Sequence, residues 1–397
     1  MSEATRREVY ADHAATTPPA PEVLGAMAAC LGDAFGNASS VHHRGEAARD
    51  QIEAARERVA ELIGATAEEI VFVASGSEAN NLALKGLLLG AQGERRRLVV
   101  SAVEHPSVLE TARWLEGRGM PVTVLPVGAE GVVNLDALRE SLGADVALVS
   151  IQMVNNETGV IQPTAAIVEL ARAAGARVHV DAVQAVGKME VDVQRLDVDL
   201  LSLAGHKFGG PLGAAALYVR RRVRLVPLVH GGHQERSRRA GTENLPAIVG
   251  LGVAAERALA RLPEAEQHGT RLGAALLAGL LGAVPGTRLN GDAERRVPGI
   301  VNVCFPGLDG EAMLHELDLA GITVSTGSAC SAASPGPSHV LVAMGLSAED
   351  AHASVRFSLG ESNEDGDVSR ILQALPPILA RLRALAEAPV RDVSRSA

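Results

Sequence analysis

The chain has 397 residues, which is long enough for one large domain with a substantial core and a smaller second domain. Its formal net charge of −10 at pH 7 excludes a generally basic surface of the kind that binds nucleic acid or acidic lipid. It has no apolar run long enough to cross a bilayer and no apolar segment of signal-peptide type, and it has only three cysteines. We therefore expect a cytoplasmic protein without a disulfide framework. We expect no direct contact with nucleic acid or membranes.

Strand-like and helical segments alternate along the first part of the chain. An amphipathic pattern predicts a helix over 46–63, and an apolar run predicts a buried strand over 70–75 that leads through SGSEANN into a helix over 80–89. Five further apolar runs end abruptly in polar residues: LVVSAVEH, VTVLPV, VALVSIQMVNNETG, RVHVDAVQ and LLSLAGHK. This pattern is typical of an α/β fold whose mostly parallel sheet carries ligand groups at the carboxyl ends of its strands.

The pattern changes from about Pro246 onward. Long helices rich in alanine, leucine and arginine come first, and they are followed by the strand-like runs GIVNVCF, ITVSTGSAC and SVRFSLG and by a final helix. We interpret this part as a smaller second domain.

Only three lysines are present, so any chemistry that needs an amine has three candidates. Lys85 lies in the middle of a predicted helix, where a solvated amine is the default, and Lys188 follows a turn where it could serve a loop or a salt bridge. Lys207 directly follows an apolar strand and precedes a glycine-rich turn, in the sequence SLAGHKFGGPLG. Its local sequence fits a nucleophilic amine or a structural lysine equally well.

Polar residues at the other predicted strand ends narrow this choice. Gly76 and Ser77 begin a helix, where free amides suit a phosphate, although a serine is also an ordinary helix cap. Asp181, with Gln184 after it, could keep a pyridine nitrogen protonated or cap a helix, and His105 could stack on a ring, move a proton or do neither. We expect these strand ends to converge with the lysine on one crevice.

The cysteines divide into two kinds. Cys30 lies in a predicted small-residue helix and Cys304 in a predicted strand core, so we expect both thiols to be buried and inert. Cys330 lies in STGSACSAASPGPS, a run of small, polar and turn residues that predicts an exposed, mobile loop. Its thiol is either a reactive nucleophile or an incidental loop cysteine.

The motifs taken together resemble a known family. In chain order they are YADHAATTP, FGNASSVHHRG, SGSEANN, EHPSVL, VNNETGVIQP, HVDAVQAVGK, AGHKFGGP, HGGHQERSRRAGTEN, STGSACS, PSHVL and SVRFSLG. This order resembles the cysteine desulfurases related to the nitrogenase and iron–sulfur-cluster enzymes, which are class V aminotransferases of fold type I, from about Tyr10 to Gly360. The resemblance implies a homodimer with pyridoxal 5'-phosphate (PLP) at the subunit interface. It also implies a large domain (15–258) with a mostly parallel seven-stranded sheet and a smaller α+β domain (1–14 and 259–397) that carries the cysteine loop.

Each matching position implies a role toward the cofactor ring. Lys207 would hold PLP covalently, Asp181 would pair with the pyridine nitrogen, and Gln184 would contact the ring hydroxyl. His105 would stack on the ring and manage thiol protons, and Asn156 would lie beside cofactor and substrate.

The resemblance also assigns the phosphate and the substrate. The residues implied for the phosphate are Gly76, Ser77, His206 and, from the partner subunit, Thr242. Arg356 would bind the substrate carboxylate with its planar fork, and Asn37 would line the same pocket. Cys330 matches the cysteine that forms the persulfide.

The implied activity is PLP-dependent desulfuration of L-cysteine to L-alanine, with transfer of sulfur from Cys330 to an acceptor or scaffold protein for cluster assembly or tRNA thiolation. Alternatives are a selenocysteine lyase, another class V aminotransferase, or a non-catalytic scaffold that binds a sulfur carrier. No resident metal is expected, and transient cluster ligation by Cys330 stays open. One departure is Ala204, which stands where the family has a phosphate-binding serine, and nearby Ser202 cannot be assumed to replace it.

Overall fold

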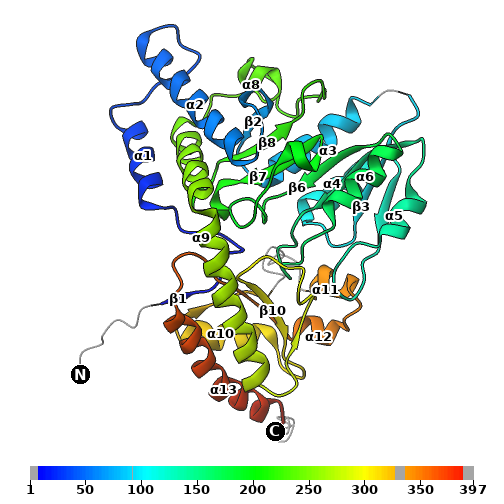
Figure 1. Ribbon diagram of the computed structural model, residues 1–397, viewed down its shortest axis with the longest axis vertical. Helices are drawn as coiled ribbons and strands as arrows, with labels where there is room; N and C mark the ends of the chain where they lie inside the picture. The colour runs from blue at the N-terminus through cyan, green and yellow to red at the C-terminus, as the bar shows by residue number, and fades with distance from the viewer. Residues whose placement is uncertain (1–7, 92, 327–335, 388–397) are drawn as a thin grey trace, which may run out of the picture.

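The computed structural model describes residues 8–91, 93–326 and 336–387. Figure 1 shows an upper part built around a sheet and a lower part with the shorter strands, connected by one long helix. The long helix is α9, Leu245–Ala283, and it packs against α1 (Pro21–Leu31), α2 (His43–Leu62) and the C-terminal helix α13 (Asp365–Glu387).

In the described residues, the upper part contains a seven-stranded sheet with the order β2-β8-β7-β6-β5-β3-β4. Its strands are β2 Ile70–Val73, β3 Arg97–Ser101, β4 Val122–Leu125, β5 Val146–Gln152, β6 Arg177–Asp181, β7 Leu200–Ala204 and β8 Ala215–Val219. Strand β8 pairs antiparallel with both of its neighbours, and the other pairs are parallel. The predicted α/β fold with a mostly parallel seven-stranded sheet is confirmed.

Helices cover both faces of this sheet, because successive strand residues point to opposite sides. Ile70 and Phe72 join the core under α1, α2, α9 and α6 (Thr164–Ala173), whereas Val71 and Val73 join the core under α3 (Gly76–Leu89) and α4 (Pro106–Glu116). The other elements of this part are η1 Ala67–Glu69, α5 Leu135–Ser141, α7 Val193–Leu196, η2 Gly205–Lys207 and α8 Gln234–Ser237.

The lower part has its own core, which joins both ends of the described chain. Val9 and Ala11 pack with residues of the second half of α9 and of the segments that follow it. The elements here are β1 Val9–Tyr10, β9 Arg288–Leu289, β10 Ile300–Cys304, α10 Gly310–Leu319, β11 Ile322–Thr323, α11 His339–Ala343, α12 Ala348–His352 and β12 Ser354–Ser358. The predicted boundary after residue 258 falls inside α9, and the division into 15–258 and the two flanking segments stays a prediction.

The predicted start of the helix over 80–89 is wrong: α3 already begins at Gly76, and only Ala74 and Ser75 separate it from the end of β2 at Val73. Ser75 caps it by accepting a hydrogen bond from the Glu78 amide. The amides of its first turn therefore lie at the carboxyl ends of the strands. Within the described ranges, no helix is both long and apolar enough to cross a membrane.

Candidate active site at the carboxyl ends of the strands

Lys207 lies in the short turn η2 that follows β7. Its Nζ donates to the main-chain oxygens of Ala14 and Ala15, each at 2.7 Å. The turn is tight, because a Cβ at Gly210 would lie 2.8 Å from the Gly205 carbonyl oxygen, and only glycine avoids this contact. The amine is thereby directed from the end of β7 onto the N-terminal segment.

The N-terminal segment 12–17 connects several predicted site residues. Arg356 donates to the Asp12 carboxylate at 2.7 Å, and Gln184 Nε2 donates to the Ala14 oxygen, which also accepts from Lys207, at 2.8 Å. A few residues further along, His206 lies 3.2 Å from the Thr16 hydroxyl. The segment belongs to the motif YADHAATTP, but no signal in the sequence showed that it joins the lysine to the arginine.

Asp181 ends β6, the strand next to β7, and its carboxylate is buried. Asn80 Nδ2 donates to one carboxylate oxygen at 2.7 Å, and the Val183 amide donates to the other at 3.0 Å. Asn80, which lies on α3, also donates to the hydroxyl of Ser107 at 2.9 Å. These two donors fix the orientation of the carboxylate at the carboxyl end of β6. Asn80 and Ser107 were not predicted from the sequence.

His105 caps α4 and is joined to Asp181 through those two residues. Its Nδ1 lies 2.8 Å from the Ser107 hydroxyl and accepts from the Ser107 amide at 3.1 Å, so geometry assigns the proton of the neutral ring to Nε2. Burial lowers the pKa of His105, Asp181 opposes this shift, and Lys207 adds to it. A neutral imidazole is therefore favoured at neutral pH.

The start of α3 lies against the ends of β6 and β7. A Cβ at Gly76 would come 2.9 Å from a methyl group of Val183 and 3.6 Å from the Ala204 side chain. Ala204 therefore faces the helix start, where a serine would place a hydroxyl. Ser202 does not fill this role, because its hydroxyl is bonded to buried His179 Nε2 at 2.9 Å.

Two more residues predicted at the phosphate have different surroundings. Ser77 is exposed at the start of α3. His206 is half-buried, and burial, followed by repulsion from Lys207 and Lys188, lowers its pKa to about 4. His206 is therefore a neutral hydrogen-bonding group at neutral pH.

Arg356 lies on β12 and is buried, with an exposed fraction of 3%. Besides the contact with Asp12, it donates to the main-chain oxygen of Asn156 at 2.9 Å, while its Nε has no partner among the described residues. The neighbouring side chain of Asn155 accepts from the Glu157 and Thr158 amides, so it serves the turn. The guanidinium thus keeps an unsatisfied donor in a buried position.

Cys330 lies outside the described residues, as do its neighbours 327–335. On one side of this gap, Ser325 pairs with Arg356 through main-chain hydrogen bonds of 3.1 and 2.6 Å. On the other side, the Ser338 hydroxyl donates to the carboxylate of Glu157. The segment before residue 327 is therefore held by β12, and the segment after residue 335 is held by the turn after β5.

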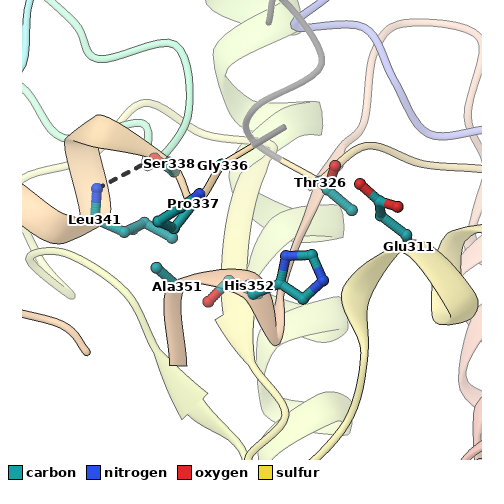
Figure 2. Close-up of a pocket in the computed structure, with 9 residues that line it drawn as sticks. Glu311, Thr326, Gly336, Pro337, Ser338, Leu341, Ala351 and His352 are labelled. Atoms are coloured by element: carbon teal, nitrogen blue, oxygen red, sulfur yellow. Dashed lines mark hydrogen bonds between the residues drawn. The ribbon is translucent and has the colours of Figure 1, made fainter. Parts of the chain in front are cut away.

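Figure 2 shows a small pocket between the two segments that flank residues 327–335. Thr326 and Glu311 lie on one side of it, and Pro337 and Ser338 lie on the other. Its volume is about 10 Å³, which leaves room for about one water molecule. None of the predicted site residues lines it, so it is not the site of the chemistry.

Two predicted residues are not brought to this cluster by any contact within the described chain. Asn37 is exposed, and its side-chain oxygen accepts from the Ser39 amide at 2.9 Å. Thr242 is exposed as well, and the preceding Arg239 pairs with Glu78 of α3 at 2.9 Å. The role predicted for Thr242, a contact with the phosphate of a second subunit, and the role predicted for Asn37, in the substrate pocket, both stay predictions.

The residues present fit PLP. The cluster offers an amine, a hydrogen-bonded carboxylate, a neutral imidazole and the first turn of a 14-residue helix. Gly76 lets the start of this helix pack closely against Val183, next to the ends of β6 and β7. The buried, unpartnered Nε of Arg356 fits a carboxylate of the substrate. Among the described residues, no group of three or more His, Cys, Asp or Glu side chains could hold a metal ion.

Comparisons with known proteins agree over most of the chain. Residues 9–371 match the family model described as Aminotransferase class-V. The cysteine desulfurase IscS of Methanosarcina thermophila is 45% identical over 377 residues, which cover 95% of this chain and 93% of that protein. The solved structure of a NifS-like protein is similar, with a TM-score of 0.89 and 36% identity over 94% of this chain and 100% of that chain. The structure of SspA in complex with cysteine is also similar, with a TM-score of 0.80 and 37% identity over 89% of this chain and 99% of that chain.

Proposed function

This chain belongs to the aminotransferase class-V family, and on that premise we propose that it is a cysteine desulfurase, which converts L-cysteine to L-alanine and carries the sulfur as a persulfide on Cys330. The observation that supports this most is the shared N-terminal segment, because Lys207 and Arg356 contact residues only two positions apart, Ala14 and Asp12. An amine for the cofactor and a guanidinium for a carboxylate are thereby placed around one short stretch of chain.

PLP would be held by Lys207 through its amine, by Asp181 at the pyridine nitrogen, and by Gln184 at the ring hydroxyl. Gly76, Ser77 and His206 would hold its phosphate, together with Thr242 of a second copy of the chain. When bound, the cofactor supplies an electron sink that makes the Cα proton of an amino acid acidic.

The residues of the chain do the remaining work. Arg356 binds the carboxylate of L-cysteine through Nε and a terminal nitrogen, and the substrate competes with Asp12 for the guanidinium. Asn156 and Asn37 line the substrate pocket. The amine of Lys207 takes the Cα proton, and neutral His105 receives and returns the thiol protons.

Sulfur transfer needs a thiolate from the chain itself. The Cys330 thiolate attacks the substrate sulfur, so that a sulfur–sulfur bond forms and the bond between Cβ and sulfur breaks. The electron pair of the broken bond stays on the three-carbon skeleton, which leaves as L-alanine after protonation. The outer sulfur of the persulfide then passes to an acceptor or scaffold protein, and the Cys330 thiol is restored. We propose that the protein is a homodimer and acts in the cytoplasm.

One experiment separates this proposal from its alternatives. Purified protein is loaded with PLP and incubated with L-cysteine, and alanine, sulfide under reductant and the mass of the Cys330 peptide are measured. Cys330→Ser should abolish sulfide release and the added mass of 32 Da expected for one sulfur atom, whereas Cys30→Ser, at a buried thiol, should leave both unchanged. Full desulfuration by Cys330→Ser would contradict the proposal, and transamination or a strong preference for selenocysteine would support the alternative enzymes.

A further inference from the structure

Lys188 is a second lysine close to the proposed site, and no role has been given to it so far. It follows β6 in the turn DAVQAVGK, and its Nζ donates to the side-chain oxygen of Gln184 at 2.7 Å and to the main-chain oxygen of the same residue at 3.3 Å. Neither acceptor is a carboxylate. The amine is therefore held by one glutamine, whose other side-chain atom faces the site.

The turn that carries Lys188 is fixed against the turn that carries Lys207. Gly187 has a φ of +78°, and a Cβ there would come 2.5 Å from the Cβ of Phe208, the residue after Lys207. Only glycine permits this approach. The Lys188 amide also bonds back to the Ala185 oxygen at 3.0 Å. Both turns thus hold their lysines in a defined relative position.

Lys188 decides which way the amide of Gln184 points. The Lys188 amine donates to the amide oxygen of Gln184 at 2.7 Å, so the amide nitrogen faces the other way. The Nε2 group of Gln184 is consequently turned toward the Ala14 oxygen, to which it donates at 2.8 Å. Lys207 donates to that same oxygen at 2.7 Å. Lys188, Gln184 and Lys207 therefore form one continuous hydrogen-bonded chain.

The surroundings of Lys188 are costly for a charged amine. Burial lowers its pKa to about 7, and repulsion from Lys207 and Arg356 adds to the shift. The neighbouring groups His13 and His206 also have lowered pKa values of about 4, for which burial is the main cause and Lys188 a further one. The amine is thus held where burial and two nearby cations oppose its charge, with Gln184 as its acceptor.

We infer that Lys188 is a positioning residue, which holds the Gln184 amide so that its N–H group is presented to the ring oxygen of PLP bound at Lys207. The inference rests on the proposed function, because it needs the cofactor to bind there. An N–H donor stabilises the anionic form of that oxygen, so its loss raises the pH at which the absorbance of the bound cofactor changes.

The test compares Lys188→Met, Gln184→Ala, the double variant and the control Lys85→Met. Lys85 is the remaining lysine, and it lies over the Trp114 ring at 4.4 Å. PLP is added to each purified protein, and its absorbance from pH 6 to 10 and its dissociation constant by equilibrium dialysis are measured. Lys188→Met should raise the pH midpoint by about one unit and weaken PLP binding about tenfold. Lys85→Met should keep the wild-type values.

The double variant distinguishes positioning from an independent contribution. If Lys188 acts through Gln184, the double variant has the midpoint of Gln184→Ala alone, and the shifts do not add. Additive shifts, or a midpoint of Lys188→Met equal to that of Lys85→Met, would overturn the inference. If Lys188→Met does not fold, the variant Gln184→Glu is measured instead. Its carboxylate still accepts from Lys188 but offers no N–H group to the cofactor. An unchanged midpoint in this variant would overturn the inference as well.

The outcome for the wild-type protein separates this inference from the proposed function. After PLP is added and reduced with borohydride, the pyridoxyl mass should be found on the Lys207 peptide. If wild type takes up no PLP on Lys207, the proposed function itself fails. If wild type is labelled there and the variants behave like the control, only the role of Lys188 fails.

Discussion

The side-chain amide of Asn80 donates to the Asp181 carboxylate at 2.7 Å, and this contact connects α3, which begins at the proposed phosphate site, to the end of β6. The amide oxygen of Asn80 has no partner among the described residues, so its orientation is determined by its donors. The contact therefore holds the carboxylate in the position where we propose that the pyridine nitrogen binds.

Asn80→Ala should weaken PLP binding about tenfold, because a hydrogen bond to a charged group contributes about 1.5–3 kcal/mol. The dissociation constant for PLP is measured by equilibrium dialysis. Asn134→Ala is the control, since this residue caps the distant helix α5 and its loss should lower stability without changing PLP affinity. Equal PLP affinities of the two variants would contradict the role of Asn80.

Ala204→Ser should strengthen PLP binding about fivefold, because the new hydroxyl would face the start of α3 next to Gly76 and give one more hydrogen bond to phosphate. Ser202→Ala is the matched control. It removes the bond to His179 and should lower the free energy of unfolding by about 1 kcal/mol without a change in PLP affinity. If neither variant binds PLP more tightly than wild type, Ala204 does not face the phosphate.

The sequence predicted the sheet and the residues at its strand ends, because apolar runs and the polar residues after them follow directly from strand periodicity. Asp181 and Lys207 were found in this way. The contact of Ala14 with Lys207 spans 193 residues, and that of Asn80 with Asp181 spans 101 residues, so no local pattern reveals them. Thr242 and Asn37 are both exposed in this chain, and their predicted roles come from the family resemblance and not from a local pattern.

The free energy of unfolding of wild type should fall as the pH rises because of Glu104, and Glu104→Gln should remove this part of the pH dependence. Glu104 is fully buried, and burial raises its pKa from 4.5 to about 8, against hydrogen bonds from Ser101 and Gln152. Between about pH 5 and 8 the unfolded chain has released this proton and the folded chain retains it, so the free energy of unfolding falls as the pH rises. Wild type should lose at least about 1 kcal/mol from this group between pH 6 and 8.5, measured by urea unfolding.

The matched control is Glu46→Gln, at an exposed position of α2. Its dependence on pH should follow that of wild type, since no buried proton is involved. If Glu104→Gln and wild type lose the same free energy between the two pH values, Glu104 is ionised in the folded protein and its raised pKa is refuted.

Arg56→Met should destabilise the protein by about 3–5 kcal/mol, because it leaves the buried carboxylate of Glu235 without its partner. Arg56 contacts both oxygens of Glu235 at 2.7 and 2.8 Å, and the Phe72 amide donates to the same carboxylate at 2.8 Å. Glu235 and the next two residues, Arg236 and Ser237, have φ values of 48°, 55° and 62°, a strained left-handed conformation that this anchor maintains.

This prediction has a second readout, because the strained residues lead to Thr242, for which we propose a contact with the phosphate in a second subunit. Arg56→Met should therefore weaken PLP binding in addition to lowering the melting temperature, and the double variant with Glu235→Gln should recover part of the stability, since no unpaired charge is then buried. Arg113→Met breaks an exposed pair with Glu110 and should change stability by less than about 1 kcal/mol. If Arg56→Met lowers the melting temperature and leaves PLP affinity unchanged, the buried pair stabilises the fold but does not position the segment that carries Thr242.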